Sequence, residues 1–211
     1  MSHQVIYSSP DELPIAIERL QGGAIDAVCT VEPMTPHAIF PGAFNPLHEG
    51  HRQIVAHAEQ EFDTTIAFEI SIVNVDKPPL DRDETRQRIV QFESNAIVYL
   101  TRAATFVEKS RLFPQSRFLI GADTLVRIAD PRYCGDPHAS DNAIDEIGAQ
   151  GCRFLVYGRM IESEFRTLTQ LDLPARLRSI CREIPESEFR ADISSTNIRS
   201  AHSNKNDSDL K

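Results

Sequence analysis

The residues most able to do chemistry gather in one short segment that carries two histidines. His48 and His51 lie three residues apart at the end of the sequence Gly-Ala-Phe-Asn-Pro-Leu-His-Glu-Gly-His, which begins at Gly42. A neutral imidazole donates one hydrogen bond, and a protonated imidazole donates two and carries a positive charge. Residues spaced by three at the start of a helix lie on the same side of it, so both rings can face one ligand. The segment therefore indicates phosphate binding.

The elements around this segment must hold the two histidines in place. An apolar run at residues 38–40 indicates a strand, Pro41 and Gly42 end it, and apolar residues return at helical spacing from about Glu49. A strand, a loop and a helix start in this order point backbone N–H groups and the positive end of the helix dipole at an anion. A His-x-x-His pair alone is equally compatible with two surface residues or a metal pair. We expect the ligand to be contacted by Gly42, Ala43, Phe44, Asn45 and Gly50.

A second group of polar residues follows the next apolar run of the chain. Lys77 precedes two prolines, which favour an extended loop over a helix, so its side chain is presented from a semi-rigid segment at a strand end. Arg86 lies in the helical pattern that comes next. In isolation, both residues would be ordinary solvated surface charges.

A third group is the short sequence Gly121-Ala122-Asp123, where a predicted strand ends and a helix begins. The ordinary explanation for Asp123 is an N-cap, in which the carboxylate accepts hydrogen bonds from the first turn of the helix and stabilises it by about 1 kcal/mol. The alternative is a contact between this carboxylate and a ligand. Both roles are compatible with each other.

The fourth group lies near the end of the chain, at Ser194-Ser195-Thr196, with Arg199 one turn further on. Hydroxyl side chains before a helical pattern again favour an N-cap. If a helix starts near Ser195, however, its amides, its hydroxyls and Arg199 form a second anion-binding position.

Strands and helices alternate along the chain, which predicts an α/β fold. Predicted strands cover residues 38–40, 64–73, 96–100, 117–120 and 153–157, and predicted helices cover residues 83–92, 106–112, 123–128 and 143–149. Such alternation implies βαβ units and a doubly wound, mainly parallel sheet, which is Rossmann-like, with its ligand crevice beyond the carboxyl ends of the strands.

Length, charge and cysteine usage narrow the class of protein. The chain has 211 residues and a net charge of −9, which disfavours general binding to nucleic acid or anionic membranes. No apolar stretch approaches the ~20 residues of a membrane span and nothing resembles a signal peptide, so we expect a cytoplasmic protein. The four cysteines show no metal or disulfide spacing, and Cys29 and Cys152, which lie in apolar runs, are assigned to the core.

The segment from Gly42 to His51 resembles the signature of the nucleotidyltransferase superfamily. Its Phe-Asn-Pro version is most similar to nicotinamide or nicotinate mononucleotide adenylyltransferases, whereas other branches more typically carry Asp in place of Asn45. The Gly-Ala-Asp sequence at Gly121 and the Ile-Ser-Ser-Thr-x-Ile-Arg sequence that ends at Arg199 resemble two further motifs of the same enzymes. The resemblance covers roughly residues 38–200.

The resemblance implies a reaction between ATP and nicotinamide or nicotinate mononucleotide, giving the dinucleotide of NAD biosynthesis and pyrophosphate. Mg²⁺ would accompany ATP, held by phosphate oxygens and water rather than by protein ligands. The catalytic residues implied are His48, His51, Lys77 and Arg199. The nucleotide would also contact Gly121, Asp123, Ser194, Ser195 and Thr196. The acceptor mononucleotide would contact Arg86, Arg132, Tyr133 and Arg159.

Two departures from the family pattern leave the acceptor open. The chain has no tryptophan, which many members place after Gly-Ala-Asp to stack on the pyridine ring, and Tyr133 is the candidate substitute. It also ends soon after Arg199. The alternatives are therefore transfer from ATP or CTP to another small phosphomonoester, or a silent nucleotide-binding homologue. A homo-oligomer is compatible with the sequence, which leaves the oligomeric state open.

The same resemblance divides the chain into three parts. We expect a lead-in segment at residues 1–36, with a helix at residues 14–20 and a strand at residues 25–31. This segment either packs against the main domain or is the remnant of a larger upstream region. The nucleotidyltransferase domain would span residues 37–202, and the polar tail at residues 203–211 is predicted to be disordered.

Overall fold

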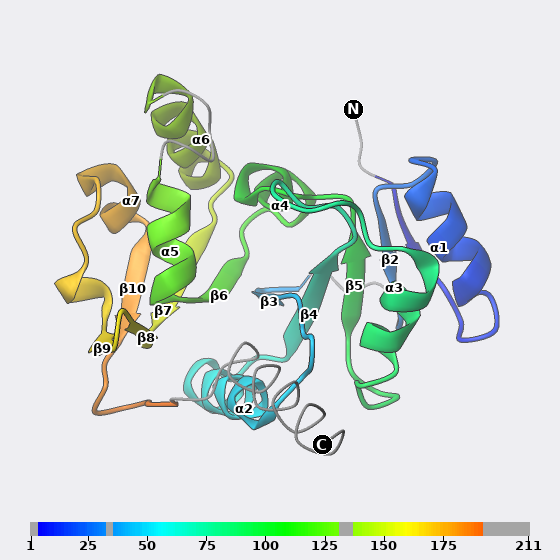
Figure 1. Cartoon of the computed structure of the whole chain (residues 1–211), viewed down its shortest axis with the longest axis horizontal. Helices are drawn as coiled ribbons and strands as arrows, with labels where there is room; N and C mark the ends of the chain where they lie inside the picture. Colours follow the sequence, from blue (N-terminus) through cyan, green and yellow to red (C-terminus); the bar gives the residue numbers. More distant parts are fainter. Residues whose placement is uncertain (1–3, 33–35, 131–136, 192–211) are drawn as a thin grey trace, which may run out of the picture.

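A computed structural model describes residues 4–32, 36–130 and 137–191 of the chain (Figure 1). Its centre is an eight-stranded sheet with the strand order β1-β2-β5-β4-β3-β6-β7-β10. The strands are β1 (Val5–Tyr7), β2 (Ala27–Cys29), β3 (Ala38–Pro41), β4 (Ile66–Ser71), β5 (Val98–Thr101), β6 (Arg117–Gly121), β7 (Arg153–Tyr157) and β10 (Cys181–Ile184). All neighbouring strands are parallel except β2 and β5, which are antiparallel. The doubly wound, mainly parallel α/β fold expected from the sequence is confirmed.

Helices connect the strands and cover both faces of the sheet. They are α1 (Leu13–Gln21), α2 (Glu49–Phe62), α3 (Arg82–Ile89), α4 (Phe106–Leu112), α5 (Ala122–Ala129), α6 (Pro137–Ala149) and α7 (Ala175–Ser179). Buried side chains of α1 and α2 belong to one apolar cluster, and those of α5, α6 and α7 belong to another. Half-buried apolar side chains of α4 pack against the second cluster. Cys29 and Cys152 are fully buried in the second cluster, which confirms their assignment to the core.

The strand order places a switch point beside β3. From β3 the chain winds through α2, β4 and β5 in one direction, then returns through β6 to wind in the other direction through β7 and β10. The connections after β3 and β6 therefore leave the sheet on opposite faces, and a crevice opens between them at the carboxyl ends of the strands. This crevice is where the histidine segment lies.

The N-terminal residues extend the same sheet at its far edge. β2 pairs with β5, with Val28 opposite Leu100, and β1 pairs with β2. Figure 1 shows α1 beside α3 at this end of the molecule. The predicted helix at residues 14–20 and the predicted strand at residues 25–31 are confirmed as α1 and β2, and the segment packs on the sheet edge through a hydrogen-bonded ladder.

The sequence did not predict the short elements. β1 has three residues, as do β8 (Arg159–Ile161) and β9 (Glu164–Arg166), which form a separate antiparallel hairpin. Three residues give too little alternation for a period to be recognised. The helix α7, with five residues, and the strand β10, with four, were also not predicted.

Capping boxes set the starts of α3 and α4, the helices that follow β4 and β5. Asp81 accepts a hydrogen bond from the backbone N–H of Glu84 at 2.8 Å, and Thr105 accepts one from Glu108 at 3.3 Å, each with the reciprocal bond present. Side chains that satisfy the first N–H groups of a helix fix where it begins. The positions of α3 and α4 are thereby defined locally. Among the described residues, no helix is long and apolar enough to cross a membrane.

Candidate functional site

The loop after β3 is shaped by packing of its aromatic residue. Phe44 is buried and adopts a positive φ of 44°, and its ring packs edge-on against Phe40, Phe68 and Phe92. A Cβ atom at Gly42 would lie 2.7 Å from the tip of this ring. Gly42 is therefore required by the ring of Phe44, a reason that the sequence did not reveal.

The two histidines form a stacked pair at the start of α2. His48 is the N-cap residue, and its ring lies 3.7 Å from that of His51 between centroids, at an interplanar angle of 22°. The backbone N–H of His48 donates to Nδ1 of His51 at 3.2 Å. Because this nitrogen accepts, the proton of neutral His51 lies on Nε2. His51 thus presents an N–H donor on the side of its ring away from the backbone. Gly50 is buried in the same turn.

Burial and positive charge keep both imidazoles neutral near pH 7. The pKa of His51 is lowered to about 3, first by burial and then by the charges of His48 and Arg159. The pKa of His48 is lowered by burial and by Arg159. In addition, Nδ1 of His48 is buried without a hydrogen-bond partner among the described residues. A bound anion would be attracted by the positive charge of Arg159 and could accept a hydrogen bond from a neutral imidazole, so the arrangement suits an acidic ligand.

Arg159, at the start of β8, brings a guanidinium to the same place. It packs on Gly121, where a Cβ atom would meet the side chains of both Arg159 and Asp123. Burial lowers the pKa of Arg159, and the nearby carboxylate of Asp123 partly offsets this effect. Arginine nevertheless stays protonated in proteins. The structure therefore gathers His48, His51 and Arg159 around one point.

Asp123 does not cap its helix. The N-cap of α5 is Gly121, and no side chain makes a capping bond there. The side chain of Asp123 is exposed at the carboxyl end of β6. The carboxylate lies close to the guanidinium of Arg159, and its contact with a ligand stays a prediction.

A cavity of about 650 Å³ adjoins the histidine segment beyond the ends of β3 and β4. Gly42, Ala43 and Asn45 of the loop line one side of it. The cationic residues at its exposed and half-buried rim are Lys77, Arg88 and Arg127. The apolar residues that line it include Ile72, Phe106, Ile128, Ile144 and Ile147. A basic rim above an apolar interior suits a phosphate group attached to a ring.

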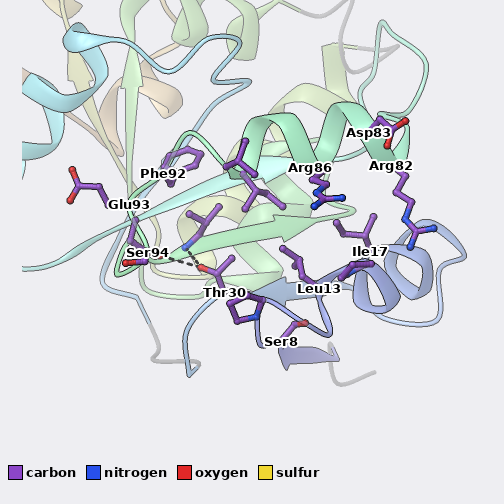
Figure 2. Close-up of a pocket in the computed structure, with 16 residues that line it drawn as sticks. Ser8, Leu13, Ile17, Thr30, Arg82, Asp83, Arg86, Phe92, Glu93 and Ser94 are labelled. Carbon is purple, nitrogen blue, oxygen red and sulfur yellow. Dashed lines mark hydrogen bonds between the residues drawn. The ribbon is translucent and has the colours of Figure 1, made fainter.

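Arg86 does not face this cavity. Figure 2 shows its side chain reaching from α3 toward α1, and it lines a separate groove of about 620 Å³ together with Leu13 and Ile17. Two residues later, Arg88 faces the other way, and its Nη1 donates to the backbone oxygen of Ala43 at 3.1 Å. The assignment of Arg86 to the substrate site is therefore not supported by its position, and Arg88 is the arginine of α3 at this site.

Several predicted residues lie outside the part of the chain that the structure describes: Arg132, Tyr133, Ser194, Ser195, Thr196 and Arg199. The described chain ends nearby, at Ala191, whose backbone oxygen accepts a hydrogen bond from Arg159 at 3.4 Å. The chain that leads to the predicted Ser194 motif thus reaches the histidine site at this residue.

The described residues contain no group of three or more His, Cys, Asp or Glu side chains placed to hold a metal ion. One carboxylate that lines the cavity, Glu69, is already bonded to Lys109.

Sequence reasoning missed Arg88, Arg127 and the pair formed by Glu69 and Lys109. Glu69 is a single carboxylate inside a predicted apolar strand, an unusual placement that signals a buried partner. That partner, forty positions along the chain, could not be identified without the fold.

Comparison with protein-family models matches residues 39–201 to the family described as cytidylyltransferase-like. The match spans most of the chain and includes His48, His51, Asp123 and Arg159. The chain belongs to the cytidylyltransferase-like family. This family lies within the nucleotidyltransferase superfamily, so the superfamily resemblance inferred from the motifs is confirmed and the chain is a nucleotidyltransferase. A search among curated proteins returned no match.

Proposed function

We propose that this nucleotidyltransferase joins ATP to nicotinamide or nicotinate mononucleotide, giving the dinucleotide and pyrophosphate. The observation that carries the proposal is the stacked, neutral pair His48–His51, with Arg159 near it and a cavity of about 650 Å³ adjoining the same loop. The Phe-Asn-Pro form of the loop supports the pyridine mononucleotide as acceptor. The basic rim and apolar interior of the cavity fit the phosphate and the ring of such a molecule.

In this reaction an oxygen of the acceptor's phosphate attacks the α-phosphorus of ATP. The new P–O bond forms as the bond from the α-phosphorus to the bridging oxygen breaks, and pyrophosphate leaves with the electron pair. No protein nucleophile is needed, so catalysis consists of holding the two phosphates in line and stabilising the charge that develops. ATP enters as its Mg²⁺ complex, so the cation belongs to the substrate.

Each residue at the site then has a role. His51 donates a hydrogen bond from Nε2 to an oxygen of the α-phosphate. His48, whose buried Nδ1 has no partner among the described residues, hydrogen-bonds to the same phosphate group. Arg159 neutralises charge on the phosphates beside the two histidines, and Lys77 does so from the cavity rim. Asp123 accepts hydrogen bonds from the ribose. The Ser194, Ser195, Thr196 and Arg199 motif holds the triphosphate, as the sequence predicts.

A pyrophosphate-release assay tests the proposal. ATP and CTP are each combined with nicotinamide mononucleotide, nicotinate mononucleotide, phosphopantetheine and glycerol phosphate. We expect release only with ATP and a pyridine mononucleotide, with the dinucleotide identified by mass. Release with CTP, or with another phosphomonoester in preference, would refute the proposed substrates, and no release with any pair would favour a silent homologue.

A further inference from the structure

A buried ion pair lies where the cavity meets the sheet. Glu69 is on β4 and Lys109 is on α4, and their side chains are 1% and 7% exposed. Both residues line the cavity beside the histidine segment. Neither residue belongs to a motif that the sequence analysis selected, and the proposed reaction does not use them.

The pair is fully hydrogen-bonded. Nζ of Lys109 donates to both carboxylate oxygens of Glu69 at 2.8 Å and to the backbone oxygen of Ala103 at 2.7 Å. Thr101 donates from its hydroxyl to Glu69 Oε1 at 2.5 Å and accepts from the backbone N–H of Ala103 at 3.2 Å. An ammonium has three hydrogens, so Lys109 has no donor left for a ligand. At the histidine site, by contrast, Nδ1 of His48 has no hydrogen-bond partner among the described residues.

Hydrogen bonds of Glu69 connect two parts of the site, the loop after β3 and the start of α4. The backbone oxygen of Glu69 accepts a hydrogen bond from the N–H of Gly42 at 2.9 Å, at the start of the phosphate-binding loop. Its side chain holds Lys109 and, through Ala103, the turn that enters α4. The first residues after that turn, Thr105, Phe106 and Val107, line the cavity. One residue thus links the loop that faces the phosphates to the wall that faces the acceptor.

A buried ion pair is an inefficient way to stabilise a fold. Removing two charges from water costs about as much as their attraction returns, and apolar residues of similar size often serve as well. Such a pair instead fixes the relative position of the two elements that carry it, because each hydrogen bond has a preferred length and direction. Phosphoryl transfer depends on such geometry, since a misplacement of about 1 Å can lower the rate about a hundredfold.

We propose that Glu69 and Lys109 are positioning residues that fix the start of α4 relative to the phosphate-binding loop, so that the bound acceptor is aligned with the α-phosphorus. The identity of the acceptor rests on the proposed function, but the alignment role does not depend on which phosphomonoester is used. Neither residue touches the reacting atoms. Their effect reaches the acceptor through the cavity wall.

The test is the double variant Glu69→Gln/Lys109→Met, which removes both charges and keeps both side-chain shapes. Each single change leaves one buried charge without its partner and destabilises the fold, so only the double variant separates positioning from folding. We expect the Tm of the double variant to lie within about 5 °C of the wild-type Tm, since a change of about 1 kcal/mol in stability moves Tm by only a few degrees. We expect kcat/KM for the acceptor to fall about a hundredfold. KM for ATP should stay within about threefold, because the bond from Gly42 to the backbone of Glu69 is unchanged.

The control is Arg111→Met/Glu146→Gln, which removes an exposed, bidentate ion pair between the same helix α4 and α6. Neither of its residues lines the cavity, so we expect wild-type kinetics.

Wild-type kinetics in the Glu69/Lys109 double variant would overturn the proposal, as would equal losses of kcat/KM toward ATP and toward the acceptor. The wild type is first assayed on the substrate panel, and the acceptor it prefers is used throughout. Failure of the proposed function therefore appears in the wild type, and failure of the positioning role appears only in the variants.

Discussion

The histidine site and the cavity floor, defined as Glu69 with Lys109, bury polar groups in opposite ways. At the histidine site, Nδ1 of His48 has no partner among the described residues. Burial lowers the pKa of His48, His51 and Arg159, and nearby positive charge lowers the pKa of the two histidines further. At the cavity floor, each charge is hydrogen-bonded within the chain. The two regions are connected through the loop that begins at Gly42, because the backbone N–H of Gly42 donates a hydrogen bond to the backbone oxygen of Glu69.

The contrast separates binding from positioning. A group that must bind an anion is held without full compensation in the free protein, so the ligand supplies what is missing. A group that only fixes geometry is compensated internally, since an uncompensated charge would weaken the fold. Changes at the histidine site should therefore cost activity and little stability, whereas single changes at the cavity floor should cost stability first.

The largest effect is expected from His51→Ala. The imidazole is placed to donate from Nε2 to a phosphate whose charge grows in the transition state, so its loss should lower kcat by about 10²–10³-fold. The KM for ATP should change much less, because the ground state gains less from this donor. Steady-state kinetics with ATP and the preferred acceptor measure both.

His57→Ala provides the matched control for that prediction. His57 lies on the same helix α2, and its ring contacts Tyr157 and Phe189 rather than the phosphate-binding loop. The His57→Ala variant should be less stable than the wild type, because these contacts are lost, and should keep the wild-type kcat. Equal losses of kcat in the two variants would mean that any histidine-to-alanine change in α2 disturbs the site, and the comparison would fail.

The next largest effect separates the two arginines of α3. Arg88→Ala should lower kcat/KM by about tenfold or more, because a charged group that contacts the loop through Ala43 and lines the cavity is lost. Arg86→Ala should change kcat/KM by less than about twofold, because its side chain lies in the groove against α1. The reverse order of the two effects would restore the assignment of Arg86 made from the sequence.

The third effect concerns stability and pH. In the folded chain the pKa of His51 is about 3, against 6.5 without the surrounding structure, so above pH 6.5 the residue is neutral in both states. Below pH 6.5 only the unfolded chain takes up the proton, and the free energy of unfolding falls with pH. From about pH 6.5 to about pH 5 the loss is at most about 2 kcal/mol, reduced by partial solvent access. The lowered pKa of His48 acts in the same direction.

Urea unfolding of the wild type and of His51→Gln over this pH range measures the contribution. The variant should lose less stability on acidification, because one group that takes up a proton on unfolding is gone. Superimposable pH profiles would show that the imidazole titrates normally in the folded chain and is not held neutral.

The sequence predicted the fold well because the central elements carry their own signals. Residues 106–112 were expected as a helix and form α4 with the same bounds, and residues 153–157 form β7 as expected. Apolar runs of about five residues between helical patterns are typical of buried parallel strands. The placement of His48 and His51 at a strand–loop–helix junction follows from the same patterns.

The features that escaped prediction depend on tertiary structure. Only one residue of α3, Thr85, is buried, so the helix has no apolar stripe to show which way it faces, and the sequence could not separate Arg86 from Arg88. The antiparallel pairing of β2 with β5 depends on which sheet edge the N-terminal segment meets. The positive φ of Phe44 follows from the aromatic cluster around it rather than from a turn motif.

The smallest expected effect is on stability, and it tests the contrast between the two regions most directly. His48→Leu removes a buried nitrogen that has no partner among the described residues, and leaving such a group unpaired costs about 1–3 kcal/mol. The bond from the backbone N–H of residue 48 to Nδ1 of His51 does not depend on the side chain of residue 48 and is retained. We therefore expect the free energy of unfolding in urea, measured without nucleotide at pH 8, to be unchanged or raised by about 1 kcal/mol, while kcat falls. Lys109→Met, which leaves the charge of Glu69 buried and unpaired, should lower the same quantity by about 3–5 kcal/mol. If His48→Leu were destabilised as much as Lys109→Met, both regions would be parts of one folding core, because the polar groups of the histidine site would then already be compensated before any phosphate binds.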